Sequence, residues 1–126
     1  MMDAYDPLTP PSIADWIELD ESERLDLVLA YHRRQGDDLP SPDVHAVAHV
    51  IVENQVALAD ETPVASVMER LMLEGLDRHE AIHAIGYVLM GALHGAAQGD
   101  NEADPTSAYY RELMQLTAKK WLNQEL

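Results

Sequence analysis

The sequence predicts an all-α fold, a compact bundle of about five helices without a β-sheet. Apolar residues recur at intervals of three and four along most of the chain, which is the spacing of one helix face. Helix-start residues and helix-stop glycines separate these stretches at short intervals. No stretch shows the sustained alternation of apolar and polar residues that is typical of a strand. The chain has 126 residues, of which 47% are hydrophobic, so we expect a single helical domain over residues 1–126.

The first third of the chain begins with an irregular segment and continues with two helix-start signals. Residues 1–11 contain three prolines and are expected to form an extended acidic arm. Ser12 is a suitable N-cap for a short helical turn. Asp20 and Glu23 match a capping box in its acidic form, and the helix that they open is expected to end at Gly36.

Proline marks the beginning of the next two helices. A helix is expected from Pro42 to about Ala59, because proline at the first helical position loses no hydrogen bond. Thr62 and Pro63 repeat the same start signal. The helix that they open is expected to end at Gly75, since glycine readily adopts the backbone conformation that follows a helix.

Two further helices complete the predicted bundle. Asp77 and Glu80 form another acidic capping box, and Gly95 is expected to end the helix that begins there. The Asp-Pro pair at 104–105 opens the last helix, which is expected to continue through Trp121.

The composition narrows the class of function. The chain has 8 Lys and Arg against 23 Asp and Glu, a formal net charge of −15. We therefore expect no nucleic-acid partner and no attraction to anionic membranes, because both need clustered basic residues. No signal peptide and no apolar run of about 20 residues is evident, and there is no cysteine, so a cytoplasmic location is expected. A well-hydrated surface is the simplest explanation of the charge; adaptation to high salt and a basic partner are alternatives.

Two pairs of histidines carry the strongest chemical signal. His45 and His49 lie four residues apart on one predicted helix, and His79 and His83 have the same spacing on another. Residues four apart share a helix face, so two packed helices would bring four imidazoles together. Glu53 continues the row of His49 by four residues and adds a carboxylate. This donor set predicts a divalent-metal site for Zn²⁺, or for Fe or Mn if further oxygen ligands join.

Glu80 is the candidate catalytic group of such a site, as a proton acceptor near metal-bound water or as a partner of a ligand. The alternative is a non-enzymatic interaction or scaffold protein. Both histidine pairs share faces with apolar residues, which is also typical of buried structural histidines. The helix from Pro42 is apolar on almost all sides, so it is either central or covered by a second subunit, and a homodimer is the simplest expectation. In that case the histidines are structural and suited to sensing pH.

Two known kinds of metal site share part of this pattern. The run from His79 to His83 matches the zinc-protease signature His-Glu-x-x-His, but Leu89 stands where the longer form of that signature has a third histidine. Ferritin-like di-iron proteins use two Glu-x-x-His motifs, of which only Glu80-x-x-His83 is found.

Hemerythrins are more similar in outline. They carry His-x-x-x-Glu on one helix, as at His49 and Glu53, and His-x-x-x-His on a later one, as at His79 and His83. They also use an earlier histidine, a role that His32 would take. The His-x-x-x-x-Asp motif of their last helix is absent.

A broader resemblance covers roughly residues 45–90, about a third of the chain. It is carried by the His-x-x-x-His helix that leads into Glu53-Asn54-Gln55 and by the run Asp77-Arg78-His79-Glu80-Ala81-Ile82-His83-Ala84. These segments resemble the bacterial family Domain of Unknown Function 1841. The resemblance implies a small cytoplasmic helical protein without an established activity, and it selects the same histidines without assigning them a chemistry.

Overall fold

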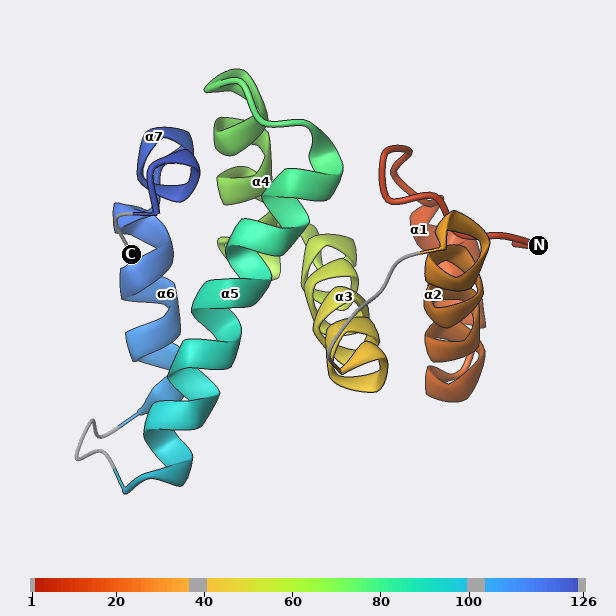
Figure 1. The fold of residues 1–126 in the computed structure, drawn as a ribbon, viewed down its shortest axis with the longest axis horizontal. Helices are drawn as coiled ribbons and strands as arrows, with labels where there is room; N and C mark the ends of the chain where they lie inside the picture. The colour runs from red at the N-terminus through yellow and green to blue at the C-terminus, as the bar shows by residue number, and fades with distance from the viewer. Residues whose placement is uncertain (1, 37–40, 100–103, 125–126) are drawn as a thin grey trace.

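The computed structural model describes residues 2–36, 41–99 and 104–124, and within them it contains helices and no strand (Figure 1). The all-α bundle predicted from the sequence is therefore confirmed. None of the helices in these residues combines the length and the apolar character needed to cross a membrane. The helices are α1 (Ile13–Glu18), α2 (Glu21–Gln35), α3 (Pro42–Ala57), α4 (Val64–Leu73), α5 (Arg78–Ala97), α6 (Pro105–Gln115) and α7 (Ala118–Leu122), with a 3₁₀ turn η1 (Ala59–Glu61) after α3.

Most helix starts lie where the local signals predict them. At α2, the Asp20 carboxylate accepts the Glu23 amide at 2.8 Å, and the Glu23 carboxylate accepts the Asp20 amide at 3.2 Å. Gly36 ends this helix with φ of 71°, in the left-handed region that glycine adopts without strain. Helix α3 begins at Pro42, as expected. These predictions succeed because each depends only on residues adjacent in the chain.

The predicted end of α5 is wrong. The helix continues through Gly95 to Ala97, Gln98 is its C-cap, and Gly99 has φ of 78°. A glycine inside a helix lowers its stability only by about 1 kcal/mol relative to alanine, so neighbouring packing can carry the helix past it.

The predicted last helix is divided into α6 and α7. The chain is extended at Leu116, and the Thr117 hydroxyl accepts the Lys120 amide to begin α7. Two contacts from the α4 end hold this break. Arg70 donates to the Leu113 carbonyl at 3.1 Å, and the Glu74 carboxylate accepts the Ala118 amide at 2.8 Å. These tertiary contacts therefore give hydrogen-bond partners to a carbonyl at the end of α6 and an amide at the start of α7.

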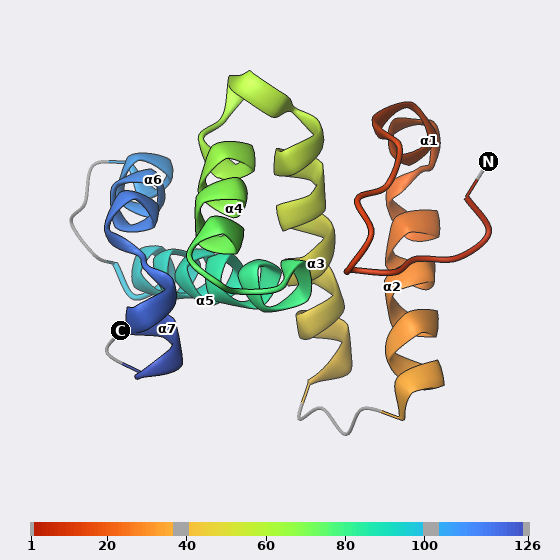
Figure 2. The same ribbon diagram turned by 90° about the horizontal axis from the view of Figure 1, so that it is seen from above.

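Helix α3 lies at the centre of the bundle and packs against α1, α2, α4 and α5. Helices α2, α3 and α4 run side by side, and α5 crosses α4 and α3 (Figure 2). Helices α6 and α7 lie on the far side of α5 from α2 (Figures 1 and 2). The central position explains why α3 is apolar on most sides, although Val44 and Val47 remain 50% and 42% exposed.

The buried apolar residues form two core clusters. The N-terminal core joins the segment before α1 to α1, α2 and α3 and consists of Tyr5, Trp16, Val28, Ala46 and Val50. The larger C-terminal core is built from α3 to α7 and includes Val52, Met68, Leu71, Ile82, Ile85 and Leu113. Both cores contain residues of α3, so this helix connects them.

The segment before α1 contains no helix or strand over residues 2–12, but it is packed against the bundle. Tyr5 is 1% exposed, and its ring centroid lies 6.0 Å from that of Trp16 and 6.1 Å from that of Tyr31. The Asp6 carboxylate accepts the Leu8 amide at 3.0 Å, which turns the chain. An arm was expected here from the prolines; the packing of Tyr5 shows that this segment contributes to the core.

Candidate metal centre

Five histidines from three helices meet at one point. Their potential ligand atoms all lie within 4.8 Å of one another. The four histidines predicted from the sequence are among them, so the two helical pairs face each other. The cluster consists of His32 on α2, His45 and His49 on α3, and His79 and His83 on α5.

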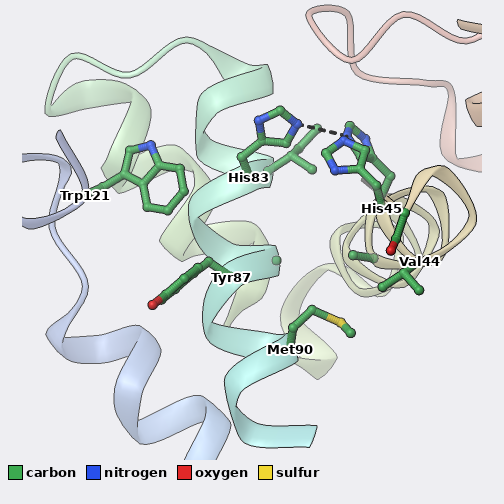
Figure 3. Close-up of a pocket in the computed structure, with 11 residues that line it drawn as sticks. Val44, His45, His83, Tyr87, Met90 and Trp121 are labelled. Atoms are coloured by element: carbon green, nitrogen blue, oxygen red, sulfur yellow. Dashed lines mark hydrogen bonds between the residues drawn. The ribbon is translucent and has the colours of Figure 1, made fainter. Parts of the chain in front are cut away.

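His49 occupies the middle of this cluster. Its Nε2 atom lies 3.1 Å from Nε2 of His45 and 3.2 Å from Nε2 of His83 (Figure 3). Imidazoles that share a metal ion at 2.0–2.1 Å have their nitrogens roughly 3.3 Å apart in a tetrahedral site and roughly 2.9 Å apart in an octahedral one. The observed separations fall between these two values.

Hydrogen bonding determines which nitrogen of His49 carries the proton. The Tyr5 hydroxyl has a single hydrogen and donates it to the Glu53 carboxylate at 2.6 Å. The same hydroxyl oxygen lies 3.2 Å from Nδ1 of His49, so it accepts the Nδ1–H of that ring. In the neutral ring, Nε2 then carries a lone pair, which is directed toward His45 and His83. A histidine held in this way by a second group is typical of metal ligands.

His32 has the same arrangement. Its Nδ1 lies 2.9 Å from the Val28 carbonyl oxygen, which can only accept, so Nδ1 is the donor. Its Nε2 is buried and has no hydrogen-bond partner among residues 2–36, 41–99 and 104–124. Buried polar atoms are nearly always satisfied, so this lone pair is a position where a cation is expected.

Burial and mutual repulsion keep the central rings neutral. Burial lowers the pKa of His49 far below its usual value, and the neighbouring imidazoles of His45 and His83 add to the shift. Burial and the adjacent His79 and His45 rings lower the pKa of His83 to about 4. Neutral imidazole is the form that coordinates a metal ion.

Glu53, predicted as a metal ligand, lies beside the cluster and outside it. Arg78 donates to its two oxygens at 2.7 and 2.8 Å, and Tyr5 occupies one of them as well. Glu53 and Arg78 are 1% and 4% exposed, so the carboxylate is committed to a buried ion pair. Glu53 contacts the cluster through the Tyr5 hydroxyl, as an orienting group for His49.

Glu80, predicted as a proton acceptor, also lies away from the cluster. Its Oε2 accepts a hydrogen bond of 2.7 Å from the indole nitrogen of Trp121. It lines a different hollow, formed with Tyr87, Leu122 and Gln124. Glu80 thus attaches α7 to the start of α5.

A pocket of about 440 Å³ opens beside the histidines, between α3 and α5 (Figure 3). His45, His49 and His83 form its polar end. The wall is mainly apolar and includes Val44, Ala48, Ile82, Met90 and Trp121, and no Asp, Glu, Lys or Arg lines it. The cluster is therefore reachable from this pocket.

The set predicted from the sequence omitted three residues that the structure places at the candidate site. His32 continues the apolar row of Leu25, Val28 and Leu29 on α2, so its inward position has a sequence signal, although only the comparison with hemerythrins used it. Tyr5 and Arg78 have no such signal, because each reaches Glu53 across more than 20 residues of chain.

Comparison of the chain with protein-family models, with curated proteins and with solved structures finds no match. The resemblance over residues 45–90 therefore stays a prediction.

Proposed function

We propose that the chain binds one divalent transition-metal ion at the histidine cluster. Nε2 atoms of His45, His49 and His83 are its ligands on the pocket side, and His32 and His79 surround it from the other side. The observation that carries the proposal is the lone pair of His49 Nε2. It is fixed by the Tyr5–Glu53 hydrogen bonds and directed toward two other imidazole nitrogens.

The donor set favours Zn²⁺. Imidazole suits Zn²⁺, Cu²⁺, Ni²⁺ and Fe²⁺, whereas Mn²⁺ prefers carboxylate and water. Since Arg78 holds the only carboxylate predicted as a ligand, the cluster of described residues offers nitrogen alone. This weakens the case for Mn²⁺ relative to Zn²⁺.

Metal content measured by mass spectrometry tests the proposal. Untagged protein purified without chelator is expected to contain about one Zn²⁺ per chain, and the His49→Ala/His83→Ala variant is expected to contain none. His94→Ala is the matched control, because His94 lies on α5 outside the cluster and should leave the content unchanged. Circular dichroism shows whether the double variant remains helical.

The opposite result is equally clear. If the wild-type protein contains no metal, and Zn²⁺, Cu²⁺, Ni²⁺ and Co²⁺ each leave its unfolding midpoint unchanged, the proposal is wrong.

A second candidate is an interaction protein whose histidines are structural. The half-exposed Val44 and Val47 on α3 favour it, because a homodimer would cover them. Sedimentation of the metal-free protein tests this reading. A dimer that Val47→Asp dissociates would support it, and a monomer at high concentration would contradict it.

A further inference from the structure

A metal ion in the cluster would carry a charge that the protein does not balance. Histidine coordinates as a neutral ligand, so five imidazoles leave the full charge of a divalent ion. Glu53, which reaches the cluster through the Tyr5 hydroxyl, is already neutralised by Arg78 through two hydrogen bonds, and Asp77, whose charge acts on His83, is not one of the clustered groups. A buried charge without a counter-charge is costly, so a bound metal ion attracts an anion from outside the chain.

The pocket is the route by which an anion would arrive. His45, His49 and His83 lie at one end of it, and the other lining residues carry no formal charge. An entering anion therefore meets no carboxylate there, in spite of the net charge of −15 over the whole chain. Hydroxide would balance part of the charge, but one water occupies only about 30 Å³ of a 440 Å³ pocket.

The wall beyond the histidines suits an apolar molecule. Val44, Ala48, Ile82 and Met90 present aliphatic and thioether surface, and Trp121 adds an aromatic ring (Figure 3). Burial of the apolar surface of a ligand against these side chains favours binding. The pocket thus combines a cationic end, once metal is bound, with an uncharged and apolar body.

We infer that this pocket binds a small organic monocarboxylate with an aliphatic or aromatic body, whose carboxylate coordinates the metal ion. This inference rests on the proposed metal site. It adds the class of ligand to that proposal, because a carboxylate supplies the anionic oxygen that the cluster lacks and its body covers the apolar wall.

Cobalt-loaded protein provides the test. Co²⁺ binding is measured first, from the visible absorption of the metal, so a failure of the metal site is recognised before any acid is added. Benzoate, hexanoate and acetate are then titrated, with benzyl alcohol and hexanol as neutral analogues. Benzoate and hexanoate are expected to change the cobalt spectrum saturably and to bind at least tenfold more tightly than acetate. The alcohols are expected to leave the spectrum unchanged.

A variant that fills the pocket tests where the apolar part of the carboxylate ligand binds. Ala48→Leu extends a side chain into the pocket without replacing a histidine, and should keep Co²⁺ binding while weakening hexanoate binding at least tenfold. Ala97→Leu, at the exposed end of α5, is the matched control and should change neither. The comparison of hexanoate with acetate on wild-type protein stands even if Ala48→Leu does not fold.

Three results overturn the inference. They are a cobalt spectrum that no carboxylate changes, binding of acetate as tight as that of hexanoate, and binding of the alcohols as tight as that of the acids. Each contradicts the inference and leaves the metal site intact. Absence of Co²⁺ binding overturns both proposals.

Discussion

The hydroxyl of Tyr5 donates a hydrogen bond of 2.6 Å to the carboxylate of Glu53, although 48 residues separate them in the chain. The same hydroxyl faces Nδ1 of His49 at 3.2 Å. Arg78 completes the arrangement by donating to Glu53 and to the carbonyl of Pro7. The segment before α1 thereby orients the central histidine of the cluster.

Tyr5→Phe is expected to lower metal affinity by about 10- to 100-fold, because His49 loses the group that holds its ring and its tautomer. Competition against a chromophoric chelator measures the change. Tyr109→Phe is the matched control, since the Tyr109 hydroxyl likewise donates a short hydrogen bond to α3, of 2.7 Å to Gln55, but makes no contact with a clustered histidine that the structure records. Equal loss of metal affinity in both variants would contradict the role of Tyr5.

Glu53→Gln is expected to destabilise the protein by about 3–5 kcal/mol, because it leaves the guanidinium of Arg78 buried without its counter-charge. Glu21→Gln removes a carboxylate whose side chain is 71% exposed and should cost no more than about 1 kcal/mol. Urea unfolding of the two variants measures the difference. Equal urea midpoints for the two variants would contradict the prediction that the buried Glu53–Arg78 pair contributes more to stability than the exposed one.

The metal-free protein is expected to lose stability as the pH falls from about 6.5 toward 4. The pKa of His83 is lowered to about 4 in the folded protein, from an ordinary value of 6.5. Between these values the unfolded chain binds more protons than the folded one, so protonation favours unfolding, and the stability is fully present only above pH 6.5. The lowered pKa of His49 acts in the same direction.

Urea midpoints at several pH values between about 8 and 4.5 measure this dependence. Asp20 and Glu74 also have lowered pKa values, from 3.8 and 4.5, so their contribution is lost mainly below this range. His83→Gln should reduce the dependence above pH 4.5 and leave the part that His49 contributes. A wild-type midpoint that stays constant over the range would contradict the prediction.

Gly91→Ala is expected to stabilise the protein by up to about 1 kcal/mol, because Gly91 is helical and an added Cβ meets no atom within 4 Å. Gly36→Ala is the contrasting variant. Its site is equally open, but its φ of 71° disfavours alanine, so it should destabilise by about 1–2 kcal/mol. Thermal unfolding compares the two, and shifts of the same sign would be inconsistent with the backbone argument.

The sequence predicts the helix starts well because their signals are local. The capping box at Asp20 and the proline at 42 specify α2 and α3 without reference to distant residues. The division between α6 and α7 has one local signal, Thr117 as the N-cap of α7, but Thr117 alone does not predict a break in the helix. The division depends on Arg70 and Glu74, which reach the break from α4 across more than 40 residues.

The histidine cluster likewise combines contacts that local spacing predicts with contacts between residues far apart in the chain. Spacing of four residues predicts that His45 lies beside His49 and His79 beside His83, and the structure brings both pairs together. Spacing also suggested that Glu53 joins them, since it lies four residues after His49. Its actual partner, Arg78, is 25 residues away, and the strength of that pairing depends on burial, which spacing does not reveal.

Helix α3 belongs to both apolar cores, and this has a consequence for cooperativity. The N-terminal core depends on α1, α2 and one side of α3, whereas the C-terminal core contains its own contacts among α4, α5 and α6. We therefore expect the two cores to open as partly separate units, which meet where the ring of His32 contacts that of His79. An ion held by His45 and His49 on α3 and by His83 on α5, with His32 of α2 beside it, would penalise opening of either unit. Binding of the metal ion at the histidine cluster would then make the two cores unfold as one cooperative unit.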